Sequence, residues 1–400
     1  MKYVVIIADG MADYPVEELN GKTPLEVAEK GLIDELASKS LCGIVKTVPD
    51  GMQPGSDIAN LSIFGYDPKI YFTGRAPLEA VSMGIDIGLS DVAYRCNLVT
   101  FRKEGENFLM DDYSAGHITT DDAKQYISIL NENINSKEFH FYSGVSYRHL
   151  MIWKNGKWEI RTTPPHDIPD KEVKKFYPEG DGSHELIKLM EKSQKIFEKT
   201  ELNKDRIKNG KKPVSSIWLW GQGKKPNMPT FQEKYGLNGS VIAAVDLING
   251  IGVLAGLKKV QVPGVTGYID TNFEGKAKFA IDCLRDNDVV FIHIEACDET
   301  SHEGNLEKKL LAIKYINDKF FKYLINGLND FENYRLLLVI DHPTPVKLKI
   351  HVPDPVPFFI YEKNKELRGV KSFNEKNCSQ AGLFIEEGFK IIDFFLNGDH

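Results

Sequence analysis

Three short, continuous apolar runs constrain the fold of this chain more than any other feature of its sequence. They span Tyr3–Ala8, Val289–Glu295 and Leu336–Ile340, and each leads into a polar residue. Strands covered on both faces of a parallel sheet have this uninterrupted pattern, whereas half-exposed strands alternate. Apolar residues also recur every three or four positions from Leu310 to Leu324, as on one face of a helix. This alternation of strands and helices predicts an α/β fold with a doubly wound, largely parallel sheet.

The middle of the chain has a different pattern and predicts a second, smaller α+β domain. Its signals are a strand at Val92–Phe101, a helix around Thr120–Leu130 and a hairpin at Trp153–Trp158. From residue 188 to residue 212 the chain is strongly polar, and no aromatic residues alternate with the charges, so a solvated helix and linker is favoured over a nucleic-acid patch. Buried-type strands resume afterwards. We therefore expect a larger α/β domain of residues 1–88 and 214–400, and an inserted lid with a basic linker at residues 89–213.

The composition is typical of a soluble globular protein. The 57 acidic and 50 basic residues give a net charge of -7, and 42% of the residues are hydrophobic. This balance argues against intrinsic disorder and against nucleic-acid binding driven by bulk charge. Asp9 interrupts the first apolar run long before a signal-peptide core or a membrane span of ~20 residues could form. The sequence thus predicts a cytoplasmic protein that has no nucleic-acid or membrane partner.

Side chains that can bind a metal ion follow all three apolar runs. Asp9 follows the first run, Asp298 and His302 follow the second, and Asp341 and His342 follow the third. Ligands of open parallel sheets bind beyond the carboxyl ends of the strands, so these side chains should converge. A single aspartate at a strand end is more often a helix cap or a turn residue, but three such strand ends favour a functional site.

The spacing within this set favours a metal centre. Asp298 and His302 are four residues apart, which places both on one side of a helical turn, and His351 follows His342 by nine residues in a proline-rich loop. Aspartate and histidine ligands without cysteine suit manganese, zinc or a similar divalent ion. Because these groups outnumber the protein ligands of one ion, we expect two adjacent ions, an arrangement that clamps the attacking and leaving oxygens of phosphoryl transfer.

A candidate nucleophile lies at the start of a predicted helix. Pro54 and Gly55 predict a turn, and Ser56 follows at the mouth of the helix. One interpretation is that Ser56 is only the N-cap of this helix. In the other, the free amides and the positive end of the helix dipole stabilise a phosphate carried by the serine, while a metal lowers the pKa of its hydroxyl.

Two phosphate-binding motifs are absent, so anion binding must use other groups. The Gly-Gln-Gly segment after Trp220 has Pro226 where a dinucleotide fingerprint needs its third glycine, and Gly275-Lys276 lacks the rest of a P-loop. Guanidinium groups match phosphate and carboxylate oxygens bidentately, although many arginines only form surface or structural ion pairs. The remaining candidates are Arg75, Arg95, His117, Arg148, His149 and His166.

Motifs spread over essentially the whole chain resemble one family. They are Asp9-Gly-Met, Gly55-Ser-Asp-x-Ala-Asn-Leu-Ser, Gly65-Tyr-Asp-Pro, Thr73-Gly-Arg-x-Pro-Leu-Glu-Ala and the set Asp298, His302, Asp341, His342 and His351. This combination resembles the archaeal-type, cofactor-independent phosphoglycerate mutases of the alkaline phosphatase superfamily. The resemblance implies an alkaline-phosphatase-like fold and a phosphorylated Ser56. It implies one metal held by Asp9, Ser56, Asp341 and His342, and another held by Asp298, His302 and His351. The implied substrate-binding groups of the inserted domain are Arg95, His117, Arg148 and His149.

The resemblance implies interconversion of 3-phosphoglycerate and 2-phosphoglycerate without 2,3-bisphosphoglycerate. The implied cofactors are two divalent metal ions, manganese first, with zinc, cobalt and magnesium as alternatives, and the implied partner is a small phosphorylated metabolite. Two segments depart from this pattern, because Asp341-His-Pro-Thr-Pro replaces Asp-His-Ser-Thr-Pro and Trp218-Leu-Trp-Gly-Gln-Gly resembles a bacterial branch proposed to be homoserine kinases. A homoserine kinase-like phosphotransferase is therefore the first alternative. A metal-dependent phosphatase or a noncatalytic metal-binding homologue is the second.

Overall fold

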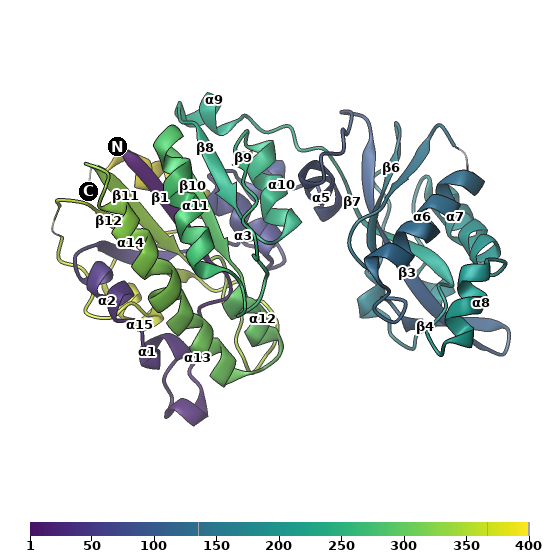
Figure 1. The fold of residues 1–400 in the computed structure, drawn as a ribbon, viewed down its shortest axis with the longest axis horizontal. Coiled ribbons are helices and arrows are strands. Elements are labelled where there is room, and N and C mark those ends of the chain that lie inside the picture. The colour runs from purple at the N-terminus through teal and green to yellow at the C-terminus, as the bar shows by residue number, and fades with distance from the viewer. Residues whose placement is uncertain (135, 366, 399–400) are drawn as a thin grey trace. The chain divides into compact units, whose positions relative to one another are not determined.

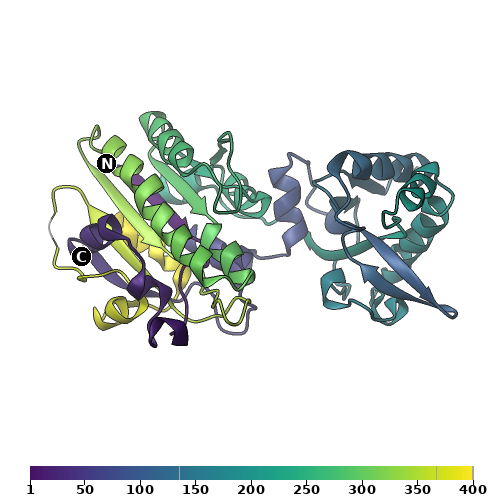
Figure 2. The same cartoon turned by 60° about the horizontal axis from the view of Figure 1, so that its bottom comes forward.

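The structure, a computed structural model, describes residues 1–134, 136–365 and 367–398. The chain forms two compact units, one made of Met1–Phe72 and Asn227–His400 and the other of Thr73–Pro226. The smaller unit, blue to teal in Figures 1 and 2, is therefore an insertion in the chain of the larger unit. No helix within the described residues is long and apolar enough to cross a membrane.

The larger unit is built on a mixed sheet of eight strands in the described part of the chain, in the order β13-β2-β12-β11-β1-β10-β8-β9. All neighbouring strands of this sheet are parallel except where β12 pairs with β11 and β2. The strands are β1 (Lys2–Ala8), β2 (Leu41–Val45), β8 (Gly239–Ile242), β9 (Lys258–Lys259), β10 (Val289–Ile294), β11 (Tyr334–Val339), β12 (Val356–Glu362) and β13 (Phe384–Ile385). The three apolar runs form the adjacent strands β10, β1 and β11, which confirms the predicted α/β class with a largely parallel sheet.

Helices cover both faces of this sheet. Crossovers between parallel strands are right-handed, so α10, which leads from β8 outward to β9, and α11, which leads back to β10, lie on opposite faces. Figure 1 shows α11, α13 and α14 together across one face. The helices of this unit are α1 (Pro24–Val27), α2 (Gly31–Ser38), α3 (Ser56–Ile63), α4 (Pro68–Tyr71), α9 (Phe231–Tyr235), α10 (Asp246–Leu254), α11 (Phe273–Asp286), α12 (Ala296–His302), α13 (Leu306–Tyr315), α14 (Lys322–Leu328), α15 (Glu375–Gln380) and α16 (Ile391–Asn397), with short 3₁₀ turns at η1 (Glu17–Leu19) and η5 (Gly388–Lys390).

The helix predicted around Leu310–Leu324 forms, but it is interrupted by one π-helical segment. α13 continues through the π-helix η4 (Ile316–Phe321) into α14. Asn317 of this segment is buried, and its Oδ1 accepts hydrogen bonds from the backbone amides of Leu32 and Ile33 in the first turn of α2. The amides at the start of a helix have no partner within the helix, so Asn317 satisfies donors that α2 leaves open.

The smaller unit contains an antiparallel sheet covered by helices, as an α+β unit should. Within its described residues β3 is central, and it pairs with β4, β6 and β7, while β5 pairs with β6. Its elements are α5 (Arg75–Ser82), β3 (Val92–Glu104), β4 (Asn107–Asp112), α6 (Thr120–Ile134), β5 (Phe139–Tyr142), β6 (Arg148–Trp153), the 3₁₀ turns η2 (Pro165–Asp167) and η3 (Val173–Phe176), α7 (Ser183–Phe197), α8 (Glu201–Lys208) and β7 (Ser216–Lys224). The sequence-based boundaries at residues 88/89 and 213/214 differ from this division, because α5 and β7 both pack against β3.

Two local expectations for the smaller unit differ from the structure. The hairpin predicted at Trp153–Trp158 is wrong, because the chain turns at residues 154–155 and no strand follows directly. β6 pairs instead with β3 and β5. The polar segment that precedes β7 also contains a core residue. Arg206 is buried and donates to Asp122 Oδ2 and to the backbone oxygen of Ala115, so it joins α8 to the rest of its unit.

Candidate active site

The carboxyl ends of β1, β10 and β11 bring the predicted ligands together. Asp9 directly follows β1, and its backbone amide donates to Ile294, the last residue of β10, at 2.9 Å. Asp341 follows β11, and its Oδ1 accepts a hydrogen bond from Gly10 at 3.1 Å. Asp298 lies in the first turn of α12, the helix that follows β10. The expected convergence of these carboxylates is therefore seen in the larger unit.

A first cluster surrounds Asp9 and Asp341. His342 Nε2 lies 3.6 Å from Asp9 Oδ1 and 3.5 Å from Asp341 Oδ2. The same nitrogen lies 3.2 Å from Ser56 Oγ. Asn60, one turn further along α3, donates to Asp341 Oδ2 at 3.1 Å and to the backbone oxygen of Ser56 at 2.8 Å. The first set of ligands implied by the family resemblance thus meets at one place.

A second cluster joins α12 to the loop after β11. Asp298 Oδ2 lies 3.2 Å from His302 Nε2, and Asp298 Oδ1 lies 3.4 Å from His351 Nε2. The two imidazole nitrogens are 2.9 Å apart. His342 links the clusters, because its ring centroid is 4.0 Å from that of His351. The second implied ligand set is therefore also assembled, directly beside the first.

His293 belongs to the first cluster, although the sequence analysis missed it. It lies near the end of β10, is buried, and places Nε2 3.2 Å from Asp9 Oδ2. Burial lowers the pKa of His293 to about 4, so the imidazole is neutral. The only sequence signal for this residue was a polar side chain inside the otherwise apolar strand Val289–Ile294.

The charges of the clusters balance one another in part. Burial raises the pKa of Asp9 well above its usual value, and the nearby Asp341 and Asp298 raise it further. Burial also opposes the ionisation of Asp298, but hydrogen bonds from His302 and His351 outweigh it and lower the pKa of this carboxyl. The same bond to Asp298 raises the pKa of His302 to about 9. A proton on His302 therefore supplies positive charge beside these carboxylates.

The donor set fits divalent cations. Ligand atoms of Asp9, His293 and Asp341 lie within 4.8 Å of one another, as do those of Asp298, His342 and His351. Oxygen and imidazole donors without cysteine suit manganese, zinc and related ions. Among the described residues, Asp9 Oδ1 and both ring nitrogens of His293 have no hydrogen-bond partner. Buried polar atoms without partners are costly, so these atoms indicate a ligand or an ion.

Ser56 is not the N-cap of its helix, so that interpretation is wrong. The cap position of α3 is Gly55, an extended residue that has no side chain to cap the helix. In the first turn the backbone amide of Ile58 donates to Asp57 Oδ1 at 3.0 Å. Ser56 is the first residue of the helix and directs its hydroxyl to His342. The observation that separates the two interpretations of Ser56 is therefore its contact with the first cluster.

A buried ion pair fixes the loops that carry the candidate ligands. Lys309 of α13 and Asp13 in the loop after β1 are both fully buried and lie 2.7 Å apart. Lys309 Nζ also donates to the backbone oxygens of Ala12 and Thr344, and Asp13 Oδ2 accepts from the backbone amide of Val346. This network ties the loop after β1 to the loop after β11.

We expect Lys309→Met to lower the free energy of unfolding by about 3–5 kcal/mol, because it leaves the buried carboxylate of Asp13 without the positive charge of Lys309 beside it. Urea denaturation at equilibrium measures this loss. Lys314→Met is the control, since Lys314 pairs with Glu29 at the surface and its loss should change stability by less than about 0.5 kcal/mol. Equal losses in the two variants would contradict the structural role of the buried pair.

The smaller unit gathers several of the predicted anion-binding groups on one face of its sheet. Arg95 of β3 and Arg148 of β6 share this face, because Arg148 is paired with Asn97, two residues from Arg95. Arg95 stacks over Trp220, 4.3 Å from the ring centroid, and pairs with Glu79 at 3.2 Å. Burial lowers the pKa of Arg95, and the positive charges of Arg75 and Arg148 lower it further, while Glu79 opposes this. Arg75, Arg95 and Arg148 therefore lie close enough to interact electrostatically.

His149 is not on this face. It follows Arg148 on β6 and so points to the opposite side of the sheet, where it is buried. Its Nδ1 accepts a hydrogen bond from the Gly144 amide at 3.0 Å, and its Nε2 has no partner in the described part of the chain. Burial lowers the pKa of His149 to about 4. The structure thus separates His149 from the arginines.

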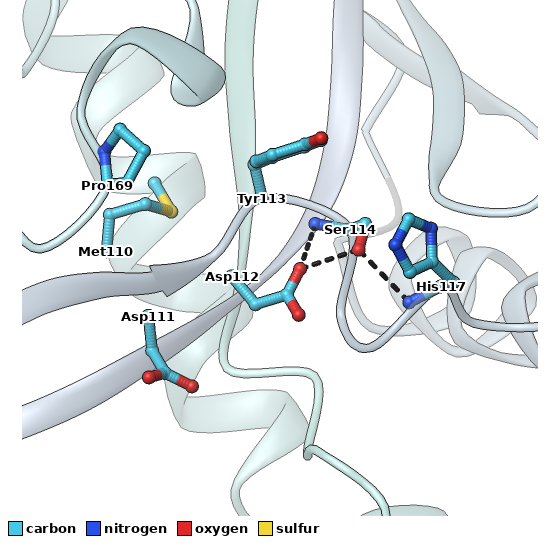
Figure 3. Close-up of a pocket in the computed structure, with 7 residues that line it drawn as sticks. All are labelled: Met110, Asp111, Asp112, Tyr113, Ser114, His117 and Pro169. Atoms are coloured by element: carbon cyan, nitrogen blue, oxygen red, sulfur yellow. Dashed lines mark hydrogen bonds between the residues drawn. The ribbon is translucent and has the colours of Figure 1, made fainter. Parts of the chain in front are cut away.

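His117 and His166 approach the arginines through aromatic neighbours. His117 has a left-handed backbone with φ of 49°, and its amide donates to Ser114 Oγ at 3.0 Å (Figure 3). It lines a pocket of about 220 Å³ together with Tyr113, Asp112 and their neighbours. The His117 ring lies 6.3 Å from Tyr147, whose ring also faces the Arg148 guanidinium at 5.8 Å. The centroid of the His166 ring lies 5.3 Å from that of Trp220, the ring over which Arg95 stacks.

The fold and the two clusters define a class of protein, an α/β protein with candidate metal-binding groups and a serine at the carboxyl ends of a largely parallel sheet. Its family follows from three comparisons. The model of the 2,3-bisphosphoglycerate-independent phosphoglycerate mutase family matches residues 37–203. A probable enzyme of this name from Geobacter sulfurreducens is 46% identical over 398 residues, covering 99% of this chain and 100% of the relative. The chain therefore belongs to the 2,3-bisphosphoglycerate-independent phosphoglycerate mutase family.

Solved structures agree with this assignment. A Pyrococcus horikoshii protein superposes with a TM-score of 0.82 at 27% identity, covering 99% of this chain and 96% of its own. The cofactor-independent phosphoglycerate mutase of Thermoplasma acidophilum superposes with a TM-score of 0.69 at 25% identity and covers 99% of both chains. The similarity therefore extends over both units of the chain.

Proposed function

We propose that this protein interconverts 3-phosphoglycerate and 2-phosphoglycerate without 2,3-bisphosphoglycerate, by phosphoryl transfer through a phosphoserine at Ser56. The single observation that carries this proposal is the position of Ser56 Oγ, 3.2 Å from His342 Nε2 and beside the carboxylates of Asp9 and Asp341. A serine hydroxyl is a weak nucleophile on its own and needs such surroundings to react with phosphate. The family membership of the chain supports the same activity.

We assign two divalent cations to the clusters, with manganese as the first candidate and zinc, cobalt or magnesium as alternatives. Asp9, Ser56, Asp341 and His342 would hold one ion, and Asp298, His302 and His351 would hold the other. When bound, these ions would lower the pKa of the serine hydroxyl and offset the charge of the phosphoryl group. His293, whose Nε2 lies 3.2 Å from Asp9 Oδ2 and has no hydrogen-bond partner among the described residues, would offer a further nitrogen to the first ion.

The residues of the chain divide the reaction into two balanced transfers. In the first, a bond forms between Ser56 Oγ and phosphorus as the bond from phosphorus to the 3-oxygen of the substrate breaks; the serine loses its proton and the glycerate oxygen gains one. In the second, the 2-hydroxyl of the same glycerate takes the phosphoryl group back and the serine is reprotonated. Asn60 holds the Ser56 carbonyl and Asp341 in place during both steps. No nucleotide is consumed.

The basic groups of the smaller unit supply anion binding in this proposal. We assign the carboxylate and phosphate of a small phosphorylated metabolite to Arg75, Arg95 and Arg148, with His117 and His166 at the margin of the same surface. His149 is buried on the other face of the sheet, so we assign it a structural role. The cytoplasmic location and the lack of nucleic-acid and membrane partners remain predictions from the sequence.

Arg148→Lys should weaken the binding of 3-phosphoglycerate by about 1.5–3 kcal/mol, because a point charge cannot replace two parallel hydrogen bonds from a guanidinium. Isothermal titration of the metal-loaded protein measures the dissociation constant directly. Arg161→Lys is the matched control, because Arg161 is an exposed arginine of the same unit that pairs with Glu179. Unchanged binding in Arg148→Lys, or the same loss in the control, would remove Arg148 from the anion site.

A panel assay tests the proposed function itself. The chelated protein is reloaded with manganese, cobalt, zinc or magnesium and given 3-phosphoglycerate with no nucleotide, and the appearance of 2-phosphoglycerate supports the proposal. Consumption of homoserine only with ATP would select the homoserine kinase-like alternative, to which the Trp218–Gly223 segment pointed. Hydrolysis of aryl phosphates without mutase activity would select a phosphatase. No turnover of any substrate would select a noncatalytic homologue.

A further inference from the structure

One buried hydroxyl contacts a ligand of each cluster. Thr344 lies two residues after His342 in the loop that follows β11, and its side chain is completely buried. Its Oγ1 donates a hydrogen bond to Asp298 Oδ1 at 2.5 Å and lies 3.2 Å from His342 Nδ1. Asp298 belongs to the second cluster, whereas Nε2 of His342 reaches the first. The threonine therefore stands between the two candidate cation sites.

The chemistry of the hydroxyl fixes the direction of both hydrogen bonds. A threonine hydroxyl has one proton, and an ionised carboxylate only accepts hydrogen bonds, so this proton goes to Asp298. The hydroxyl oxygen can then only accept from His342, which places the imidazole proton on Nδ1. Nε2 of His342 is left with its lone pair, directed toward Ser56 Oγ and the two carboxylates of the first cluster. This is the tautomer in which Nε2 can bind a metal.

The backbone of Thr344 is anchored independently of either cluster. Its amide donates to the backbone oxygen of Ala12 at 3.2 Å, and its carbonyl accepts from Lys309 Nζ at 3.0 Å. Lys309 is held in turn by Asp13 at 2.7 Å. The position of the hydroxyl is therefore set by the loop after β1 and by α13.

We propose that Thr344 is a positioning residue that couples the two cation sites by holding His342 in its Nδ1-protonated form and orienting Asp298 with the same hydroxyl. The inference rests on the two-cation site of the proposed function. Partners that orient metal ligands in this way typically change metal affinity by 10–100-fold when they are removed. Because one hydroxyl serves both ligands, its loss should weaken both sites together.

Manganese titration of the chelator-stripped protein tests this coupling, with free manganese counted by electron paramagnetic resonance. In Thr344→Val, which keeps the shape but removes the hydroxyl, we expect both manganese dissociation constants to rise by roughly 10–100-fold. Thr344→Ser keeps the hydroxyl and should bind both ions within a few-fold of the wild type. Thr300→Val is the control, because within the described residues the buried Thr300 hydroxyl hydrogen-bonds only to the backbone carbonyls of Ala296 and Cys297 in α12.

Nitrogen-15 spectra of the metal-free wild-type protein provide a second readout that does not depend on the Thr344 variants. The His342 signals, assigned by their loss in His342→Gln, should report a proton on Nδ1. A proton on Nε2 would overturn the inference, as would wild-type manganese affinity in Thr344→Val or an equal loss in Thr300→Val. These measurements are independent of turnover, so a protein that lacks mutase activity but shows coupled manganese binding would refute the proposed function and leave this inference standing.

Discussion

Ser56→Ala should abolish phosphoryl transfer, lowering the rate by roughly 10⁴–10⁶-fold, because it removes the oxygen that carries the phosphoryl group between the two half-reactions. The rate of interconversion of 3-phosphoglycerate and 2-phosphoglycerate measures this loss. Since Gly55 rather than Ser56 caps α3, the substitution removes no capping bond, and the free energy of unfolding should change by less than about 0.5 kcal/mol. Mass spectrometry of the wild-type protein after incubation with substrate should detect phosphate on Ser56.

Ser62 provides the matched control on the same helix. Its hydroxyl is fully buried and donates to the backbone oxygen of Thr47 at 2.6 Å, so its proton is engaged by a backbone carbonyl and not by a side chain of either cluster. Ser62→Ala should keep the phosphorylated peptide and most of the activity, apart from a loss of stability of about 1 kcal/mol for the deleted hydrogen bond. Phosphate on Ser62 in the wild type, or full activity of Ser56→Ala, would contradict the assignment of the nucleophile.

The central strands and the convergence of the ligands could be predicted because both depend on local patterns. A run such as Val4–Ala8 is apolar throughout only if both faces of its strand are covered, and the structure buries all of these residues. Once three such strands are parallel, the residues after them meet at the same edge of the sheet. The positions of Asp9, Asp298 and Asp341 follow from that topology alone.

Other features depend on long-range contacts that no local pattern contains. His293 lies within an apolar strand, and its role is visible only through its 3.2 Å contact with Asp9 of the neighbouring strand. The turn predicted after Trp153 is present, because Asn155 has a left-handed backbone with φ of 50°. The second strand of the predicted hairpin does not form, because β6 pairs with β3 and β5 instead. Arg148 and His149 are consecutive residues of β6, and consecutive side chains of a strand point to opposite faces of the sheet.

Ser56, the proposed nucleophile, illustrates the same limit within one turn of helix. A serine after Pro-Gly has the same sequence signal whether it is the cap or the first helical residue. The two cases differ only in whether the helix begins at Ser56 or one residue later. The exact ends of a helix are the part of a sequence-based prediction that is least certain. Only the contact of Ser56 with His342, 286 residues further along the chain, favours the proposed reactive role of this serine over a capping role.

His302→Ala should reduce the bound manganese toward one ion per chain and abolish turnover, because it leaves the second cluster with Asp298 and His351 alone. Equilibrium dialysis followed by elemental analysis measures the stoichiometry. Stability provides a second readout, since free ion at 100 times its dissociation constant stabilises a folded protein by about 2.7 kcal/mol for each site. Manganese should therefore stabilise the wild type through two sites but His302→Ala through only one. The increase in the free energy of unfolding should be smaller in the variant by the contribution of one site.

The control for this variant is His184→Ala, because His184 is an exposed histidine that pairs with Glu185 in the smaller unit. It should bind two ions and keep full activity. Chelation of the wild type should remove turnover in the same way as His302→Ala, but manganese should restore only the wild type. Two tightly bound ions in His302→Ala would refute the assignment of the second cluster, and they would require His342, which already contacts His351, to replace the missing imidazole.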